Sequence, residues 1–215
     1  MRLESPELSD EELARQTQAG SLVAFEELVY RYEARLYRFV FARTGHDTDA
    51  RDLTQTAFVA AYRGISRFNP QRRFAPWLFS ITRHAMIDHF RATPVATDEP
   101  LPTLLDPRDP SVVLAERETH SAIWQLARRT LTNDQFAALW LKYEEDLPVK
   151  DIARAMRKTG LHVKVLLHRA RQKLLRELNA DRAFVVSHGV GGVAFRSPTA
   201  LRPETTRGCV PDYKP

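Results

Sequence analysis

Residues 147–174, with the sequence LPVKDIARAMRKTGLHVKVLLHRARQKL, constrain the fold more than any other part of the chain. Their pattern predicts a short helix from Pro148 to Met156, a turn of roughly three or four residues, and a longer helix that begins near Gly160. Two helices joined by so short a turn form a helix-turn-helix, in which the second helix can enter the major groove of DNA. This segment therefore predicts a helical domain suited to duplex DNA.

The surface of this predicted helix pair is almost purely cationic, because residues 154–176 contain eight basic residues and no Asp or Glu. Each cation set against a DNA phosphate releases condensed counterions, so this surface suits a polyanion. A basic face that is merely solvated usually carries acidic residues at i,i+4 spacing, and this stretch has none. The pattern therefore favours contact with DNA. The basic residues are Arg154, Arg157, Lys158, Lys164, Arg169, Arg171, Lys173 and Arg176.

Positive charge is concentrated in one part of the chain, whose formal net charge is +5. Residues 114–180 hold 13 basic and 8 acidic residues, whereas residues 1–91 hold 13 and 12. A local excess favours a local nucleic-acid site over a generally basic protein.

The single cysteine, Cys209, excludes a disulfide framework or a cysteine zinc site within one chain. The N-terminus is acidic and lacks the apolar core of a signal peptide. No apolar run approaches the roughly 18–20 residues of a membrane span. These features predict a cytoplasmic protein in a reducing compartment.

Helical periodicity dominates the chain before residue 183, and capping and stop signals delimit four helices in residues 1–91. Residues 94–110 then hold five prolines and four acidic residues, which predicts an extended linker. A further capping box, of Thr132 with Gln135, opens a helix before the helix-turn-helix. The signals in the first four helices are the capping box of Ser9 with Glu12, the cap Ser21, the stop Gly45, the cap Asp47 and the first-turn Pro76.

The predicted fold class is all-α, with two small helical domains joined by an extended linker. After Asn179 the helical pattern fails, and a segment rich in Gly, Pro, Ser and Thr predicts a flexible tail. The predicted boundaries are 1–91 for the first domain, 92–111 for the linker, 112–179 for the helix-turn-helix domain and 180–215 for the tail.

Two surfaces of the first domain have a functional and a structural interpretation. The third predicted helix exposes Asp49, Asp52, Gln55 and Thr56 beside Phe58, which suits a basic helical partner but equally an ordinary solvated face. The following loop and helix alternate cations with aromatic residues, as surfaces for single-stranded DNA do. Alternatively, Trp77, Leu78 and Ile81 belong to the core and the arginines only solvate it. We expect Trp77 and Leu78 to pack there, which leaves Arg72, Arg73, Arg83 and His84 freer to contact DNA. The alternating residues are Arg67, Phe68, Arg72, Arg73, Phe74, Trp77, Arg83, His84 and Arg91.

The strings DARDLTQTAFVAAYRGISRF and FAPWLFSITRHAMIDHFR resemble region two of bacterial sigma factors of the extracytoplasmic-function (ECF) group. The family pattern is D-x-x-D-[LV]-x-Q-[DE]-x-F, followed by F-x-x-W-L-x-x-I-[AT]-R-N-x-x-x-D-x-x-R. The earlier string AFEELVYRYEARLYRF also looks like the start of region two. The string HVKVLLHRARQKL resembles the end of region four, T-V-K-x-x-L-x-R-A-R-x-x-L. The resemblance covers about residues 9–178.

The resemblance implies an alternative sigma factor that binds core RNA polymerase and directs promoter-specific initiation. In this family, the D-x-x-Q helix binds the coiled coil of the largest catalytic polymerase subunit. The following loop and helix open the minus-ten element and hold one non-template base, and region four reads the minus-thirty-five element as duplex. The polymerase-binding residues carried over are Asp49, Asp52, Gln55 and Phe58. The minus-ten residues are Arg72, Arg73, Phe74, Trp77, Arg83, His84, Asp88 and Arg91. The minus-thirty-five residues are His162, Lys164, Val165, His168, Arg169 and Arg171.

The implied partners are core RNA polymerase, promoter DNA and an anti-sigma factor, without insertion of this chain into a membrane. The acidic linker would thread toward the polymerase active site and the RNA exit path. No catalytic residue, cofactor or metal is expected, since the sequence lacks a Gly-rich phosphate loop and a nucleophile elbow. The pairs His84–His89 and His162–His168 do not share a helical face as i,i+4 residues would.

The sequence departs from the family pattern at three places. His84 stands where Asn is usual, which leaves the preferred minus-ten base open. Arg157 and Lys158 replace a Gly and a hydrophobic residue in the turn, which predicts a reshaped turn or a frayed first helix. His162 replaces a Thr that would cap the helix or touch phosphate.

Other functions remain as alternatives. A stand-alone helix-turn-helix regulator usually dimerises to place two recognition helices on two half-sites, and no dimerisation helix is evident. A structural module, with the linker as a tether, would not need the arginine–aromatic loop. A sigma factor should bind core polymerase and bind duplex DNA poorly alone, whereas a repressor should bind duplex DNA without polymerase.

Overall fold

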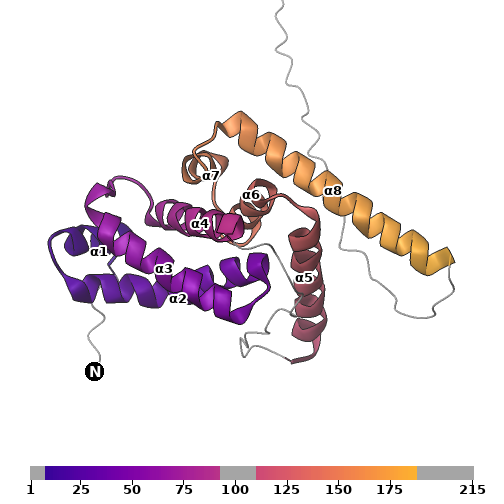
Figure 1. Ribbon diagram of the computed structural model, residues 1–215, viewed down its shortest axis with the longest axis horizontal. Helices are drawn as coiled ribbons and strands as arrows, with labels where there is room; N and C mark the ends of the chain where they lie inside the picture. The colour runs from indigo at the N-terminus through magenta and orange to yellow at the C-terminus, as the bar shows by residue number, and fades with distance from the viewer. Residues whose placement is uncertain (1–7, 93–109, 188–215) are drawn as a thin grey trace, which may run out of the picture. The chain divides into compact units, whose positions relative to one another are not determined.

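The computed structural model describes residues 8–92 and 110–187, which form helices and no strand (Figure 1). The all-α prediction is therefore confirmed. Contacts group residues up to Leu178 into one compact unit and those from Asn179 into a second. Most of the predicted linker and tail lies outside the described residues. The elements are α1 (Asp10–Gln18), α2 (Leu22–Thr44), α3 (Asp47–Gly64), the 3-10 turn η1 (Ile65–Arg67), α4 (Phe74–Ala92), α5 (Pro110–Thr130), α6 (Asn133–Tyr143), α7 (Val149–Ala155) and α8 (Gly160–Ser187).

Local hydrogen bonds start and stop the first two helices where the sequence predicts. The Ser9 hydroxyl accepts a hydrogen bond from the N–H of Glu12 at 3.1 Å, and the Ser21 hydroxyl accepts one from the N–H of Ala24 at 3.3 Å. These bonds satisfy N–H groups that have no partner within the helix. Gly45 ends α2 with a left-handed φ of 79°, which glycine adopts without steric cost.

The predicted cap of the third helix is wrong. His46 occupies the cap position of α3 without a side-chain capping bond, and Asp47 is the first helical residue. The Asp47 carboxylate instead accepts hydrogen bonds from the Tyr37 hydroxyl at 2.6 Å and from the Arg51 Nε at 2.8 Å. Asp47 therefore fastens the start of α3 to α2.

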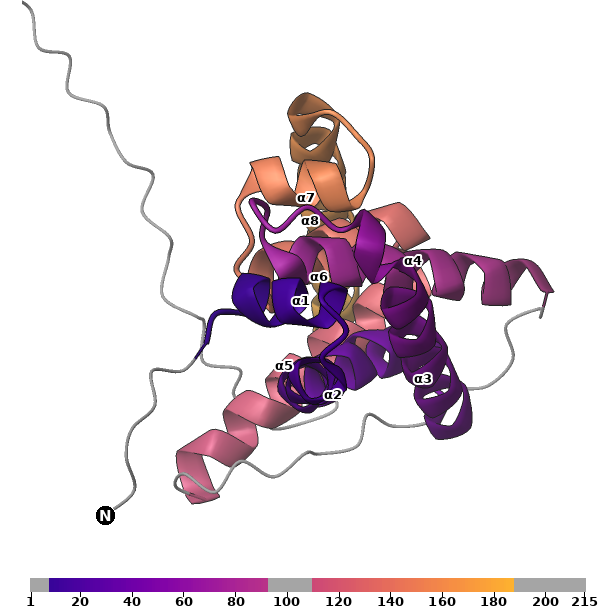
Figure 2. The same ribbon diagram turned by 90° about the vertical axis from the view of Figure 1, so that its left-hand side faces the viewer.

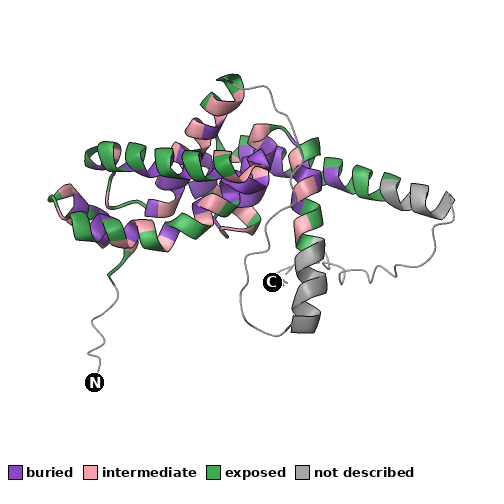
Figure 3. Cartoon of the chain, turned by 60° about the horizontal axis from the view of Figure 1, so that its bottom comes forward, coloured by how far each residue is buried: buried purple, intermediate pink, exposed green. Residues whose placement is uncertain are grey.

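The apolar face of α2 forms the centre of the N-terminal core. Leu28, Tyr32, Leu36 and Phe39 on this face are buried, and α2 contacts α1, α3, α4 and α5 (Figure 2). Buried residues line the inner faces of these helices, while the outer face of α3 is exposed (Figure 3). The inner face of α3 is also buried, and it consists of Leu53, Ala57, Phe58 and Ala61.

The C-terminal helices confirm the capping box and the helix-turn-helix. The Thr132 hydroxyl accepts from the N–H of Gln135 at 3.3 Å, and the Gln135 side chain accepts from the N–H of Thr132 at 3.2 Å. Helices α7 and α8 follow, with the turn between Ala155 and Gly160. One face of α8 is buried, and it consists of Val163, Leu166, Leu167, Ala170 and Leu174.

Helix α8 extends beyond its predicted end. The pattern predicts an end near Asn179, but the helix continues to Ser187. No Gly or Pro interrupts the chain between Gly160 and Gly189, so no residue in this stretch breaks the backbone hydrogen bonding. Within the described ranges, no helix is both long and apolar enough to cross a membrane.

The turn of the helix-turn-helix contains a left-handed residue that is not glycine. Arg157 has a φ of 52°, and its N–H donates to the carbonyl of Arg154 at 3.1 Å. Arg157 thus adopts a conformation that glycine adopts more easily. The cost of this conformation for a residue with a Cβ is about 1–2 kcal/mol.

Replacing Arg157 by Gly should therefore stabilise the protein. The relief of left-handed strain is partly offset by the greater freedom of glycine in the unfolded chain, so we expect a gain of about 0.5–1 kcal/mol in the free energy of unfolding. Urea denaturation of the full chain measures this change. Arg157→Ala is the matched control, because it removes the same charge and keeps the strain. Equal stabilities for the Gly and Ala variants would contradict the prediction.

Candidate nucleic-acid interface and docking groove

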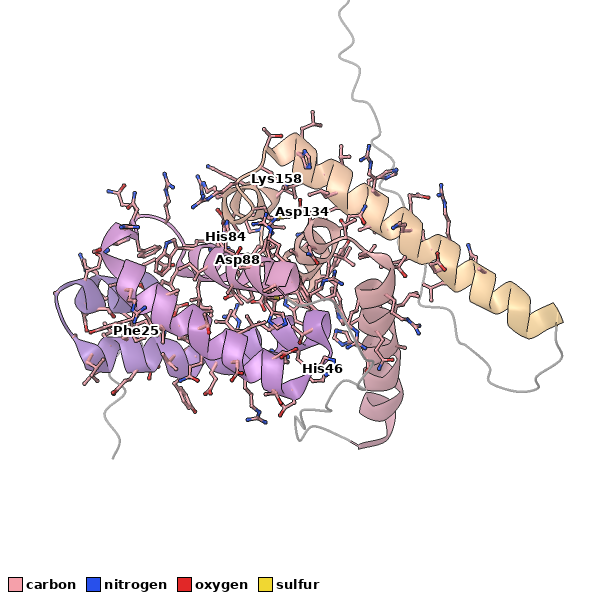
Figure 4. All side chains as sticks on the ribbon, in the orientation of Figure 1. Phe25, His46, His84, Asp88, Asp134 and Lys158 are labelled. Carbon is pink, nitrogen blue, oxygen red and sulfur yellow. The ribbon has the colours of Figure 1, made fainter. Side chains whose placement is uncertain are left out.

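A groove of about 1090 Å³ runs between α2 and α3. Aromatic rings form much of its wall, with the ring of Phe25 centred 4.9 Å from that of Tyr62 and 6.5 Å from that of Phe58 (Figure 4). Leu22 and Val59, at its edge, are exposed. An apolar groove between two helices is the kind of surface that receives an amphipathic helix.

Polar groups lie along the same groove. Hydrogen bonds from Arg51 and Tyr37 lower the pKa of the Asp47 carboxyl, which is therefore ionised at neutral pH. The hydroxyl of Thr54 is buried in the lining and makes no hydrogen bond among the described residues. A buried hydroxyl without a partner costs free energy, so a bound partner could stabilise it by accepting or donating a hydrogen bond.

The predicted polymerase-binding residues lie in two places on α3. Gln55 and Phe58 line the groove, and Phe58 is buried in its wall beside the strip. Asp52 is exposed on the solvent side of α3. Asp49 is half-buried, and one of its carboxylate oxygens lies 3.5 Å from Nε2 of His89 on α4. The helix thus places carboxylates and an amide beside an apolar groove.

The loop before α4 exposes its arginines and buries its aromatic residues. Arg72 and Arg73 are exposed, whereas Phe74 is only 1% exposed. The Phe74 ring is centred 5.5 Å from each of the rings of Phe68 and Trp77. A direct contact between Phe74 and DNA would therefore require the loop to rearrange. Leu78 is buried and Trp77 is partly buried against the core, as the structural interpretation expects.

Helix α4 presents a mixed polar face. Nδ1 of His84 donates a hydrogen bond to the carbonyl of Ser80 at 2.6 Å, which leaves Nε2 for another partner. Asp88 and Arg91 are exposed, with a carboxylate oxygen 3.7 Å from the guanidinium. Arg83 differs, because its side chain is only 11% exposed and is paired with Asp134 of α6.

The second helix of the helix-turn-helix has a cationic face that is exposed to solvent. All six predicted minus-thirty-five residues are exposed on α8, opposite the face that is buried. The Thr159 hydroxyl caps this helix by accepting from the N–H of His162 at 3.2 Å, so the His162 side chain is not needed as a cap. The six residues are His162, Lys164, Val165, His168, Arg169 and Arg171.

Sequence reasoning missed Leu161, which is 75% exposed in the first turn of α8. It lies one helical turn before Val165, so the two apolar side chains share the exposed face. Apolar side chains on such a helix can contact the methyl group of thymine. The sequence contained a signal for this residue. The buried apolar stripe of α8 begins at Val163, so Leu161 is an apolar residue that lies outside this stripe.

Two family models match this chain. The family model Sigma-70 region 2 matches residues 28–93, and the model Sigma-70, region 4 matches residues 123–174. The first match covers most of α2 together with α3 and α4, and the second covers the helix-turn-helix and the helix before it.

Individual relatives extend the similarity over most of the chain. The ECF RNA polymerase sigma factor BldN of Streptomyces coelicolor is 34% identical over 79% of this chain and 66% of its own length. The ECF RNA polymerase sigma factor SigW of Bacillus subtilis is 27% identical over 76% of this chain and 94% of its own. A solved structure of CnrH, a sigma factor of Cupriavidus metallidurans, in complex with the cytosolic domain of CnrY has a TM-score of 0.62 and 26% identity. That match covers 80% of this chain and 98% of CnrH. With both sigma regions present in this order, the chain belongs to the ECF group of sigma factors.

Proposed function

We propose that this sigma factor divides promoter recognition among three surfaces. The α2–α3 groove and the exposed strip of α3 bind core RNA polymerase, the loop and helix α4 hold the opened minus-ten strand, and α8 reads the minus-thirty-five duplex. The observation that carries this proposal is the exposed cationic face of α8, which lies opposite a fully apolar buried face on the same helix.

The groove suits a helical partner with basic and apolar residues. Its aromatic wall would bury apolar side chains, and the carboxylates of Asp47 and Asp52 would attract cations at its edge and beside it. Gln55 adds an amide that both donates and accepts hydrogen bonds. These features support a coiled coil of the polymerase as the partner.

The α4 surface suits an unpaired strand. Arg72 and Arg73 would contact the backbone phosphates, and the free Nε2 of His84 would accept a hydrogen bond from a base edge. Because Nδ1 donates to Ser80, neutral His84 presents an acceptor at this position. A base with a donor on its exposed edge would therefore be favoured.

The partners follow from these surfaces and from the relatives. Core RNA polymerase and promoter DNA would bind the groove, α4 and α8, and the protein would act in the cytoplasm without catalysis of its own. The CnrH structure contains the cytosolic domain of CnrY. By analogy, an anti-sigma protein would bind this chain and compete for the same surfaces.

Removing one carboxylate from the α3 strip should weaken polymerase binding without unfolding the protein. Asp52 is exposed and lies on the strip beside the groove, so Asp52→Ala should weaken binding to core polymerase at least about tenfold and abolish transcription. Fluorescence anisotropy with labelled full-length protein measures the affinity. Thr48→Ala, an exposed change at the start of the same helix, is the matched control. Normal core binding by Asp52→Ala would refute the role of this strip.

Removing one cation from α8 should impair only upstream recognition. Arg169→Ala should cost about 1–3 kcal/mol of binding at the minus-thirty-five element, because a good base contact is worth that much. Footprinting of the polymerase complex measures the loss, and the minus-ten footprint should persist. Gln172→Ala changes a neighbouring exposed residue of the same helix and should have no effect. An unchanged upstream footprint for Arg169→Ala would contradict the assignment of α8.

A further inference from the structure

Helix α1 contacts η1 and α4, the two elements that flank the loop of residues 68–73 (Figure 2). The match to Sigma-70 region 2 begins at residue 28, so α1 lies outside it. One face of α1 is buried, and the Asp10 carboxylate fastens the helix to α2. This carboxylate accepts hydrogen bonds from the Tyr32 hydroxyl at 2.5 Å and from Nη1 of Arg31 at 3.0 Å. Contacts between α1 and the loop are therefore anchored in the N-terminal core.

The Gln18 side chain, at the end of α1, binds the first end of the loop. Its amide nitrogen donates to the carbonyl of Ile65 at 2.8 Å and to the carbonyl of Phe68 at 2.7 Å. One carbonyl belongs to η1 and the other to the residue that follows η1. Because a side-chain amide has two N–H donors, both hydrogen bonds can form at once. Gln18 therefore fixes the point at which the chain leaves η1 and enters the loop.

The Glu11 side chain, two helical turns before Gln18, binds the second end of the loop. One of its carboxylate oxygens accepts a hydrogen bond from the N–H of Phe74, the first residue of α4, at 3.0 Å. The residue before α4 is Arg73, whose side chain has no acceptor with which to cap a helix. A carboxylate at the start of a helix also interacts favourably with the helix dipole. Glu11 thus provides, from α1, a cap that the preceding residue cannot provide.

The loop between these two points is a turn that exposes its cations. The N–H of Arg72 donates to the carbonyl of Asn69 at 2.9 Å. Phe68 and Phe74, at the two ends of the loop, are buried with their rings centred 5.5 Å apart. Arg72 and Arg73 are exposed between them. Because both ends of the loop are bound to α1, the positions of these arginines depend on α1.

We propose that Gln18 and Glu11 are positioning residues for recognition of the opened minus-ten strand. They are seven residues apart and lie on one face of α1, where they bind the two ends of the loop. We call this pair the α1 clamp. Ordering the loop before DNA arrives lowers the entropy cost of binding the strand through Arg72 and Arg73. This inference rests on the proposed minus-ten role of the loop, and it gives α1 a part in strand binding without contact with DNA.

Amide hydrogen exchange in the full chain, without DNA, tests whether the α1 clamp holds the loop. Gln18→Met keeps an unbranched side chain and removes both donors, whereas Glu11→Ala removes the acceptor. Each variant should speed exchange in peptides that span residues 66–76 by roughly three- to tenfold, as expected for the loss of a hydrogen bond. Glu11→Gln keeps an oxygen acceptor and should exchange like the parent. Unchanged exchange in both Gln18→Met and Glu11→Ala would overturn the proposal.

Gln16→Met is the matched control, and thermal unfolding of every variant checks that the fold persists. Gln16 lies on the same helix, and its amide donates to a carboxylate oxygen of Glu12 within that helix at 3.5 Å. The same substitution at this position leaves the bonds to the loop in place, so exchange in the loop should match that of the parent. If Gln16→Met speeds exchange as much as Gln18→Met does, the effect arises from α1 as a whole and the proposed role of the clamp is wrong.

Strand opening provides the second measurement, with core polymerase and a promoter chosen from genomic fragments that the parent protein transcribes. Permanganate reactivity of unpaired thymines measures opening near minus ten, and protection of the upstream DNA measures binding by α8. Gln18→Met and Glu11→Ala should reduce opening several-fold and leave the upstream protection unchanged, and Glu11→Gln should restore opening. Equal loss of opening and upstream protection would indicate a general defect and would contradict a specific role in strand binding.

Arg72→Ala distinguishes failure of this inference from failure of the proposed function. Suppose that Arg72→Ala reduces opening, but Gln18→Met and Glu11→Ala loosen the loop and still open the promoter like the parent. The loop then binds the strand, and the α1 clamp is not required for it. If Arg72→Ala opens the promoter like the parent, the proposed minus-ten role of the loop fails, and the role of the α1 clamp fails with it.

Discussion

Burial of the apolar face of α2 is the constraint on which the other surfaces of this sigma factor depend. Leu28, Tyr32 and Leu36 are inaccessible to solvent or nearly so, and each large side chain buried in this way contributes about 1.5–3 kcal/mol. Helices α1, α3 and α4 are positioned by their contacts with α2. With its inner face fixed in this core, α3 turns its polar strip outward, and the space that α2 and α3 leave between them is the groove.

Helix α8, like α3, packs one face in the core and exposes the other. Val163 and Ala170 are fully buried and hold the helix on the domain, so the cations on the other face need no role in folding. Cations that are free of intramolecular acids retain their full electrostatic attraction for phosphate. The cations of α4 are different, since Arg83 is already paired with a carboxylate of α6. Among the described residues, the cations of α8 are thus not paired with acids, whereas Arg83 of α4 is.

Local signals in the sequence predicted much of this structure. The caps at Ser9, Ser21 and Thr132 and the stop at Gly45 depend on hydrogen bonds within a few residues, which sequence patterns record directly. The six residues that the resemblance to sigma region four assigns to DNA all lie on the exposed face of α8, because the spacing of apolar residues along this helix determines which face is buried.

The errors arose where the structure depends on distant partners. The Asp47 carboxylate accepts hydrogen bonds from the side chains of Tyr37 and Arg51 and does not cap a backbone N–H, which its position in the sequence could not show. Phe74 is enclosed by rings from Tyr32 and Phe68, which lie elsewhere in the sequence. The pairing of Arg83 with Asp134 joins residues 51 positions apart, and no local pattern reports such a contact.

In vitro transcription tests the central claim most directly. A library of genomic fragments would be transcribed by bacterial core polymerase with and without this protein, and the start sites would be mapped. The account predicts promoter-specific transcripts only when both are present, with shared sequence elements near minus ten and minus thirty-five. Absence of such transcripts, together with tight binding of the protein alone to duplex DNA, would contradict it and indicate a stand-alone regulator.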